Sequence, residues 1–120
     1  IDVDIDLGFD ISLRKSVRLA GIDTPESRTK DANEKKYGLE AKEWLKQQLK
    51  DKSVDMIRIK TEKPDSTEKY GRILGWLYID NDTISINEKM INLGYAWSYL
   101  GDKKIKDFAL LDQRRKNPIN

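Results

Sequence analysis

The chain has 120 residues, of which 38% are hydrophobic and 37% are charged, with 23 Lys and Arg against 21 Asp and Glu. This length suits one domain, and the apolar content is above that of disordered chains. No apolar run approaches the roughly 18 residues of a transmembrane helix, and no signal peptide is visible, so we expect no membrane association and leave the compartment open. A net charge of +2 excludes a histone-like polycation, so nucleic-acid binding would need basic residues gathered on one face.

Cysteine and histidine are both absent from the chain. Their absence excludes disulfides, thiolate catalysis, an ordinary zinc site and a histidine general base. Any catalytic acid or base must therefore be Asp, Glu, Lys or Tyr. A metal site would be rich in oxygen ligands, which favours a hard cation such as Ca²⁺ or Mg²⁺.

Residues 1–14 alternate apolar and polar side chains without a break. This period predicts a strand with one buried face, and the length of the run indicates a bend or hairpin at Gly8. The aspartates at positions 2, 4 and 6 fall on one face and are interpreted as surface or edge charges. Because the chain opens at Ile1 in mid-pattern without an initiator methionine, we expect that a segment upstream has been removed.

The next elements alternate between strand and helix. A strand over Val17–Ile22 should end at Asp23-Thr24-Pro25, because proline fixes φ and moves the preceding residue out of the helical region. Residues 27–36 are predicted to be a polar loop. A helix follows over Lys36–Lys50, with an apolar stripe that indicates core packing. The stripe consists of Tyr37, Ala41, Trp44, Leu45 and Leu49.

The second half of the chain predicts two strands and two helices. A strand is predicted over Val54–Lys60, followed by a polar loop. A central strand buried on both sides is expected over Arg72–Ile79, because this segment is apolar on both alternating faces. A capping box at Ser85 starts a helix that stops at Gly94. An aromatic strand or loop over 95–101 and a short helix over 107–116 complete an α+β order of elements with mostly short-range strand pairing. A small barrel with helices packed outside fits this order.

Two segments carry residues suited to chemistry on a phosphodiester. Arg18 and Arg72 lie on separate strands near turns, and their planar guanidinium groups could grip one phosphate from two sides. Asp23 could ligate Ca²⁺ through its carboxylate and Thr24 through its backbone carbonyl. Glu26, beyond the rigid Thr-Pro turn, could orient or deprotonate the attacking water.

Each of these assignments has a structural alternative. Asp-Thr-Pro-Glu is also a common composition of turns and helix entries. Arg18 could reach solvent or pair with Asp4 or Asp6. Tyr70-Gly71 could be an ordinary tight turn. The residues alone therefore define an α+β domain with a candidate phosphate site.

Five motifs, in a characteristic order and near characteristic spacings, decide between these alternatives. Because it contains these motifs, the chain resembles the staphylococcal nuclease (thermonuclease) family over all but about the last fifteen residues. The motifs are Val17-Arg18-Leu19 through Asp23-Thr24-Pro25-Glu26, Lys36-Tyr37-Gly38 with Glu40-Ala41, Lys69-Tyr70-Gly71-Arg72, Ile86-Asn87-Glu88, and Leu93-Gly94 with Ala96.

The resemblance implies a fold and an activity. The fold would be a five-stranded OB-fold barrel with two or three helices packed outside and a truncated first strand. The nuclease domain would cover residues 1–105, followed by a short helix and basic tail over 106–120. The activity would be Ca²⁺-dependent endonucleolytic cleavage of DNA and RNA, single-stranded or locally melted, that leaves 3′-phosphate ends.

The resemblance also implies roles for individual residues. Arg18 and Arg72 would bind the phosphate and stabilise the transition state, and Glu26 would activate the water. Asp23 and Thr24 would be calcium ligands. The residues that would contact substrate are Lys69, Tyr70 and Tyr99.

The chain departs from the family pattern in two ways. The family usually has Asp-Gly-Asp-Thr immediately upstream, with a principal calcium ligand, so we expect weak Ca²⁺ binding and an open edge at the first strand through which the chain could oligomerise. The hairpin over residues 7–16 is longer than in the family. The alternative function is therefore a non-catalytic OB-fold module that binds single-stranded nucleic acid through Tyr70, Trp97 and Tyr99.

Overall fold

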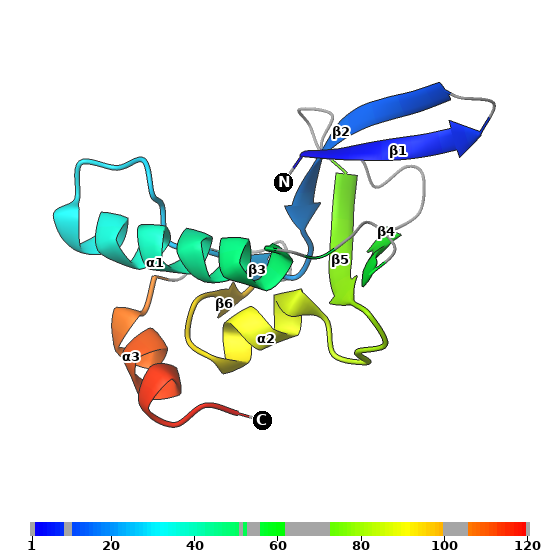
Figure 1. Cartoon of the computed structure of the whole chain (residues 1–120). Helices are drawn as coiled ribbons and strands as arrows, with labels where there is room; N and C mark the ends of the chain where they lie inside the picture. The colour runs from blue at the N-terminus through cyan, green and yellow to red at the C-terminus, as the bar shows by residue number, and fades with distance from the viewer. Residues whose placement is uncertain are drawn as a thin grey trace.

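A computed structural model of the chain describes residues 2–8, 11–50, 52, 56–61, 73–99 and 106–119. Over these residues the protein has three helices, a four-stranded sheet and a separate pair of short strands (Figure 1). The predicted α+β class is confirmed. None of the helices in these ranges is long and apolar enough to cross a membrane.

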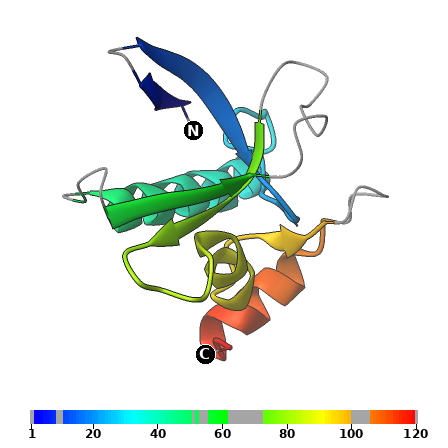
Figure 2. The same ribbon diagram turned by 90° about the vertical axis from the view of Figure 1, so that its right-hand side faces the viewer.

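The four-stranded sheet has the order β1-β2-β5-β4. Strands β1 (Asp2–Gly8) and β2 (Ile11–Leu19) form an antiparallel hairpin whose register shifts between Asp6 and Gly8, which confirms the expected hairpin at Gly8. Strand β5 (Ile73–Ile79) pairs in parallel with β2 and antiparallel with β4 (Ile57–Thr61). The β1–β2 hairpin extends away from the helices (Figures 1 and 2).

Strands β1 and β4 are the two edges of this sheet, so the part of the chain that the structure describes forms no closed barrel. The five-stranded OB-fold barrel stays a prediction. The expected continuous strand over Val17–Ile22 is wrong, because a turn at Ala20-Gly21 separates β2 from β3 (Ile22–Asp23). Gly21 has a φ of 76°, which glycine adopts without steric cost. The turn sends β3 to pair with β6 (Trp97–Ser98) instead of with the larger sheet.

Helix α1 (Ala32–Leu49) begins one turn earlier than predicted. The side chain of Asp31 accepts hydrogen bonds from the backbone N–H groups of Asn33 and Glu34, which makes Asp31 the N-cap. The polar run that was expected to be loop therefore supplies the first turn of the helix. The predicted apolar stripe is confirmed for Ala41, which is buried in the core, and for its neighbours Trp44, Leu45 and Leu49 packed against that core.

Helix α2 (Ile86–Asn92) confirms its predicted caps. The Ser85 hydroxyl accepts from the Glu88 N–H, and the chain leaves the helix at Gly94 with a φ of 85°. Ile86 and Met90 are buried and pack against the sheet. Helices α1 and α2 thus share one hydrophobic core with the inner face of β5.

Strand β5 is central in the sheet but is not buried on both sides as predicted. Leu77 and Ile79 point into the core, whereas Leu74, Trp76 and Tyr78 alternate with them and are half-buried. The core cluster joins the inner residues of β5 to side chains of α1 and α2, so the helices cover one face of this strand. The outer face of β5 stays accessible to solvent.

A buried asparagine ties α2 to the sheet. Asn87 is 2% exposed, and its side-chain oxygen accepts from the Leu77 N–H at 3.0 Å. Its amide nitrogen donates to the carbonyl oxygens of Ala20 at 2.8 Å and Gly75 at 3.0 Å. These three hydrogen bonds therefore connect α2 both to β5 and to the turn after β2. They also satisfy backbone groups that are buried away from water.

Helix α3 (Phe108–Lys116) confirms the short helix predicted over 107–116, and Asp107 is its N-cap. The Phe108 ring packs at 4.9 Å from the ring of Tyr37 in α1 and at 5.4 Å from Trp97 in β6. The guanidinium of Arg115 lies 5.0 Å from the Tyr37 ring. These contacts join α3 to the rest of the domain.

Candidate active site

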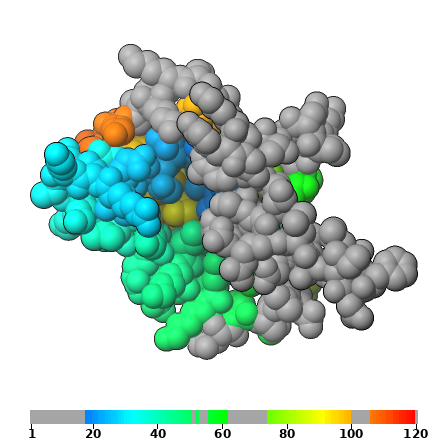
Figure 3. Space-filling model, turned by 90° about the horizontal axis from the view of Figure 1, so that it is seen from above, coloured from blue at the N-terminus to red at the C-terminus, as the bar shows by residue number. Residues whose placement is uncertain are grey.

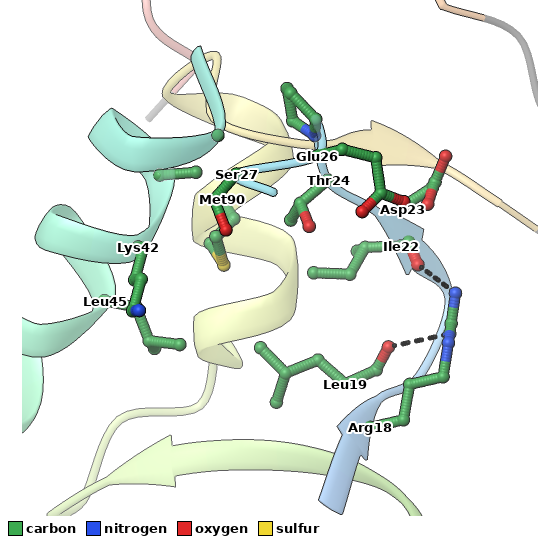
Figure 4. Close-up of a pocket in the computed structure, with 13 residues that line it drawn as sticks. Arg18, Leu19, Ile22, Asp23, Thr24, Glu26, Ser27, Lys42, Leu45 and Met90 are labelled. Atoms are coloured by element: carbon green, nitrogen blue, oxygen red, sulfur yellow. Dashed lines mark hydrogen bonds between the residues drawn. The ribbon is translucent and has the colours of Figure 1, made fainter. Parts of the chain in front are cut away.

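The structure contains a cavity of about 440 Å³ between the segment that leaves β2 and the face of α1. Seen from above, it is a hollow between that segment and α1, with atoms of α2 at its floor (Figure 3). We call this cavity the cleft, and Figure 4 shows the residues around it. Its lining combines one arginine, one lysine, two carboxylates, two hydroxyls, one glycine and apolar side chains: Arg18, Leu19, Ile22, Asp23, Thr24, Pro25, Glu26, Ser27, Gly38, Ala41, Lys42, Leu45 and Met90.

Arg18 enters the cleft from the end of β2. Its guanidinium donates to the carbonyl oxygens of Leu19 at 3.3 Å and Ile22 at 3.2 Å (Figure 4). The same group lies 5.7 Å from the centre of the Tyr99 ring. The bond to Ile22 spans the Ala20-Gly21 turn, so the backbone around this turn fixes the direction of the guanidinium before any ligand arrives. Preorganisation of this kind lowers the cost of binding a phosphate.

Two carboxylates follow Arg18 along the chain. Asp23 is half-buried in β3, Pro25 is buried, and Glu26 is exposed. In Figure 4 the side chains of Asp23 and Glu26 lie on the side of β3 where the Arg18 guanidinium lies. The structure therefore brings Arg18, Asp23, Thr24 and Glu26 to one cleft.

A buried glutamate behind the cleft, paired with an exposed lysine, holds the backbone of Glu26. Glu34, in the first turn of α1, is 5% exposed, and its Oε2 accepts from the Glu26 N–H at 3.0 Å. The Lys106 ammonium lies 3.0 Å from the same oxygen. The hydrogen bond that Lys106 donates to Glu34 raises the pKa of Lys106, and the charges of Glu26 and Asp23 raise this pKa further. Sequence reasoning missed Glu34, because a glutamate in a polar run gives no signal of burial.

Gly38 lets α1 approach the Glu26 backbone. A Cβ atom at this position would lie 2.5 Å from the Glu26 carbonyl carbon and 2.6 Å from the Ser27 nitrogen. Both neighbours are backbone atoms, so no side-chain movement could relieve the contact. The Tyr37-Gly38 motif is thus explained by the packing of the helix against the loop that carries Glu26.

The donor set of the cleft consists of hard oxygen atoms, which is the chemistry that Ca²⁺ prefers. Asp23 and Glu26 supply carboxylates, and Thr24 supplies a backbone carbonyl. Among the residues described here, no group of three or more acidic, His or Cys side chains is placed to hold a metal. The cleft therefore fits the chemical class of Ca²⁺ with fewer protein ligands than the six to eight oxygens of a complete shell.

The remaining predicted residues divide into two groups. Arg72, Lys69 and Tyr70 lie outside the described residues. Ile73, which follows Arg72 in the chain, pairs with Val17 in β2, immediately before Arg18. The hypothesis that Trp97 offers a base-stacking surface is wrong. Trp97 is 5% exposed, and its ring nitrogen donates to the Asp107 carbonyl.

Replacing Lys106 by methionine is expected to lower the melting temperature at neutral pH, because the buried Glu34 loses its cation. The raised pKa of Lys106 means that its stabilisation is complete below the unfolded value of about 10.4 and is lost as pH rises through the higher folded pKa. Circular dichroism melts from neutral to strongly alkaline pH measure this effect. If the wild-type protein still melts at a higher temperature than the variant, by the same margin, above the folded pKa of Lys106, the assignment is contradicted. Lys36→Met, at an exposed position of α1, is the control.

The fold and the cleft together define an α+β domain with a candidate site for binding and cleaving a phosphodiester. The family model described as staphylococcal nuclease homologue matches residues 16–116 of this sequence. The chain belongs to this family, and the resemblance inferred from the motifs is confirmed.

Three relatives illustrate the similarity. The chain is 32% identical over 116 residues to the uncharacterized protein MJ1439 of Methanocaldococcus jannaschii, covering 82% of this chain and 55% of that protein. It is 37% identical over 83 residues to the probable staphylococcal-like nuclease CAN1 of Oryza sativa subsp. japonica, covering 69% of this chain and 21% of that protein. It is 25% identical over 107 residues to the endonuclease YncB of Bacillus subtilis, covering 87% of this chain and 49% of that protein. The chain thus spans about half of these relatives or less.

Proposed function

We propose that this domain is a calcium-dependent endonuclease that hydrolyses phosphodiester bonds of DNA and RNA, single-stranded or locally melted, and leaves 3′-phosphate ends. One observation carries the proposal. Arg18, Asp23, Thr24 and Glu26 line the same cleft, in a chain of a family whose relatives include proteins named as nucleases and endonucleases.

The arginines bind the phosphate in this mechanism. A guanidinium presents several N–H donors in one plane, which matches two phosphate oxygens and favours the extra negative charge of the transition state. Arg18 is already oriented by the Leu19 and Ile22 carbonyls. We assign Arg72 the same task from the other side, since the residue after it pairs with Val17, the neighbour of Arg18.

Glu26 handles the proton of the attacking water. Its exposed carboxylate accepts a proton as the water oxygen bonds to phosphorus, and the bond from phosphorus to the 5′-oxygen breaks. The 5′-oxygen takes up a proton from solvent and leaves as a hydroxyl, and the phosphate stays on the 3′-oxygen. The hydrogen bond from the Glu26 N–H to Glu34 fixes the backbone of this residue during the step.

Asp23 and the Thr24 carbonyl are the residues that would hold Ca²⁺. The bound cation would neutralise phosphate charge and orient the attacking water. Lys69 and Tyr70 are assigned to a nucleotide phosphate, and Tyr99 to the sugar or base. Tyr99 is half-buried beside the Arg18 guanidinium, which supports a place next to the scissile phosphate.

Cleavage assays on fluorogenic single-stranded DNA and RNA oligonucleotides test the proposal. We expect product in Ca²⁺, loss of product when a chelator removes the cation, and recovery on readdition, because the phosphate charge is then neutralised again. Enzymatic analysis of the product ends should find 3′-phosphates. Equal cleavage with and without the chelator would reject calcium dependence, and 5′-phosphate ends would reject the assigned bond.

A non-catalytic module that binds single-stranded nucleic acid is the second candidate. The small number of protein ligands for a cation in the described part of the cleft favours it. This candidate predicts binding that the chelator leaves unchanged and no product after long incubation with Ca²⁺. The same assay therefore separates the two functions.

A further inference from the structure

The solvent face of the β4–β5 pair carries a pattern that the cleft does not explain. In the register of these strands Arg58 lies opposite Tyr78, and Lys60 lies opposite Trp76. Residues directly opposite in an antiparallel pair project to the same face. Both cations are exposed and both aromatic residues are half-buried. The Arg58 guanidinium lies 5.2 Å from the centre of the Tyr78 ring. We call these four residues the β4–β5 platform.

The platform borders a second, shallow cavity of about 790 Å³, which Arg58, Lys60 and Tyr78 line together with residues of the turn after β5. Arg58 donates through Nε to the Asp80 carbonyl at 3.0 Å and through Nη2 to the Asp82 carbonyl at 2.8 Å. These bonds hold the guanidinium near the Tyr78 ring. Strand β4, which carries Arg58 and Lys60, lies at the opposite end of the molecule from the start of α1 (Figure 1).

Cationic side chains outnumber acidic ones among the described residues around the platform. The Lys89 ammonium lies 2.7 Å from an Asp82 carboxylate oxygen. The hydrogen bond from Lys89, its charge and the nearby charges of Arg58 and Lys52 lower the pKa of Asp82. Asp82, one of the two acidic side chains of the turn, is therefore already paired with a cation, and Lys60 forms no ion pair within the described ranges. This surface attracts an anion.

The platform is continuous with the cleft. Trp76 Nε1 lies 3.9 Å from where a Cβ of Gly21 would be. The Gly21 carbonyl accepts from the Tyr99 N–H at 2.9 Å, and Tyr99 lies against Arg18. A polynucleotide that leaves the cleft past Tyr99 would therefore meet Trp76 first and then Tyr78, which lies further along β5.

We propose that the β4–β5 platform binds the single-stranded stretch of polynucleotide that flanks the bond in the cleft. Exposed cations contact phosphates along a strand, and accessible aromatic rings stack on bases without regard to sequence. Arg58 and Lys60 supply the cations, and Trp76 and Tyr78 supply the rings. This inference rests on the proposed function for the identity of the ligand and adds a second contact region that lengthens the footprint on the substrate.

Fluorescence anisotropy of labelled oligothymidylates of about 4 and about 16 nucleotides measures binding to the platform. A chelator in the buffer prevents cleavage during the measurement. The wild-type protein should bind the longer oligonucleotide more tightly, with a steep salt dependence. Lys60→Glu and Tyr78→Leu should each reduce the ratio of the two affinities by about tenfold. Lys60 is exposed, so its variant tests the proposal even if Tyr78→Leu is less stable. Lys36→Glu, on α1, makes the same change of charge as a control.

Three results would overturn the inference: no preference for the longer oligonucleotide, a preference that survives both variants, or an equal loss in the Lys36→Glu control. Loss confined to the platform variants supports it. A separate cleavage assay with Ca²⁺ reports on the proposed function. A protein that shows the length preference but yields no product would keep the platform and lose the nuclease assignment.

Discussion

Replacing Arg18 by alanine is expected to lower kcat for phosphodiester cleavage by about 10²-fold or more, because the transition state loses a preorganised guanidinium. Glu26→Gln and Arg72→Ala should have effects of similar size. KM should change less than kcat, since the interaction strengthens as charge develops on the phosphate. Initial rates on a fluorogenic oligonucleotide in Ca²⁺, as a function of substrate concentration, separate the two constants.

Arg18 also braces the Ala20-Gly21 turn, so a matched variant must separate chemistry from stability. Arg18→Gln keeps N–H donors for the Leu19 and Ile22 carbonyls and removes the charge. We expect the melting temperature of this variant to stay near that of the wild type while kcat falls as in Arg18→Ala. Undiminished kcat in folded Arg18→Gln and Glu26→Gln proteins would remove both residues from the mechanism.

Replacing Asn87 by alanine is expected to destabilise the domain by about 3 kcal/mol or more. The substitution leaves the Leu77 N–H and the Ala20 carbonyl buried without their partner, and each unsatisfied group costs about 1–3 kcal/mol. For a domain of this size the melting temperature should fall by about 10 °C or more. Thermal and urea unfolding followed by circular dichroism measure the change.

Asn92→Ala is the matched control, because it makes the same chemical change in the same helix at a half-buried position. Its effect should be within about 0.5–1 kcal/mol of zero. Asn87→Asp should be at least as damaging as Asn87→Ala, since a carboxylate would face the carbonyl oxygens of Ala20 and Gly75. Equal melting temperatures for Asn87→Ala and Asn92→Ala would show that the buried amide contributes little.

Local chemistry made several elements predictable from the sequence. Ser85 and Asp107 cap helices because their side-chain oxygens bind backbone N–H groups within the next turn. Gly94 ends α2 because it adopts a positive φ. The break at Pro25 and the hairpin at Gly8 likewise depend on residues within a few positions of each other.

Features that depend on distant partners were beyond sequence reasoning. The parallel pairing of β2 with β5 joins Val17 to Ile73, and no local pattern encodes this choice. The outer face of β5 reads as apolar, yet Trp76 and Tyr78 border solvent because no described helix covers that side. The Ala20-Gly21 turn lies inside an apolar run, where the glycine was the only local signal.

The candidate site shows the same division. The short segment from Arg18 to Glu26 could be assigned because its members are close in sequence, and the structure places them around one cleft. Glu34 and Lys106 could not be paired, because 72 positions separate them and each is an ordinary charged residue in its own neighbourhood. Their contact exists only because α1 and the segment before α3 meet behind the Glu26 backbone.

The Glu34–Lys106 ion pair has a mechanical consequence. Lys106 lies directly before the N-cap of α3, and Glu34 holds the Glu26 peptide. Tension on α3 would therefore reach the peptide of Glu26 through two side chains, without first separating the strands of the sheet. A pull or twist on this helix would thereby act on the loop at the mouth of the cleft.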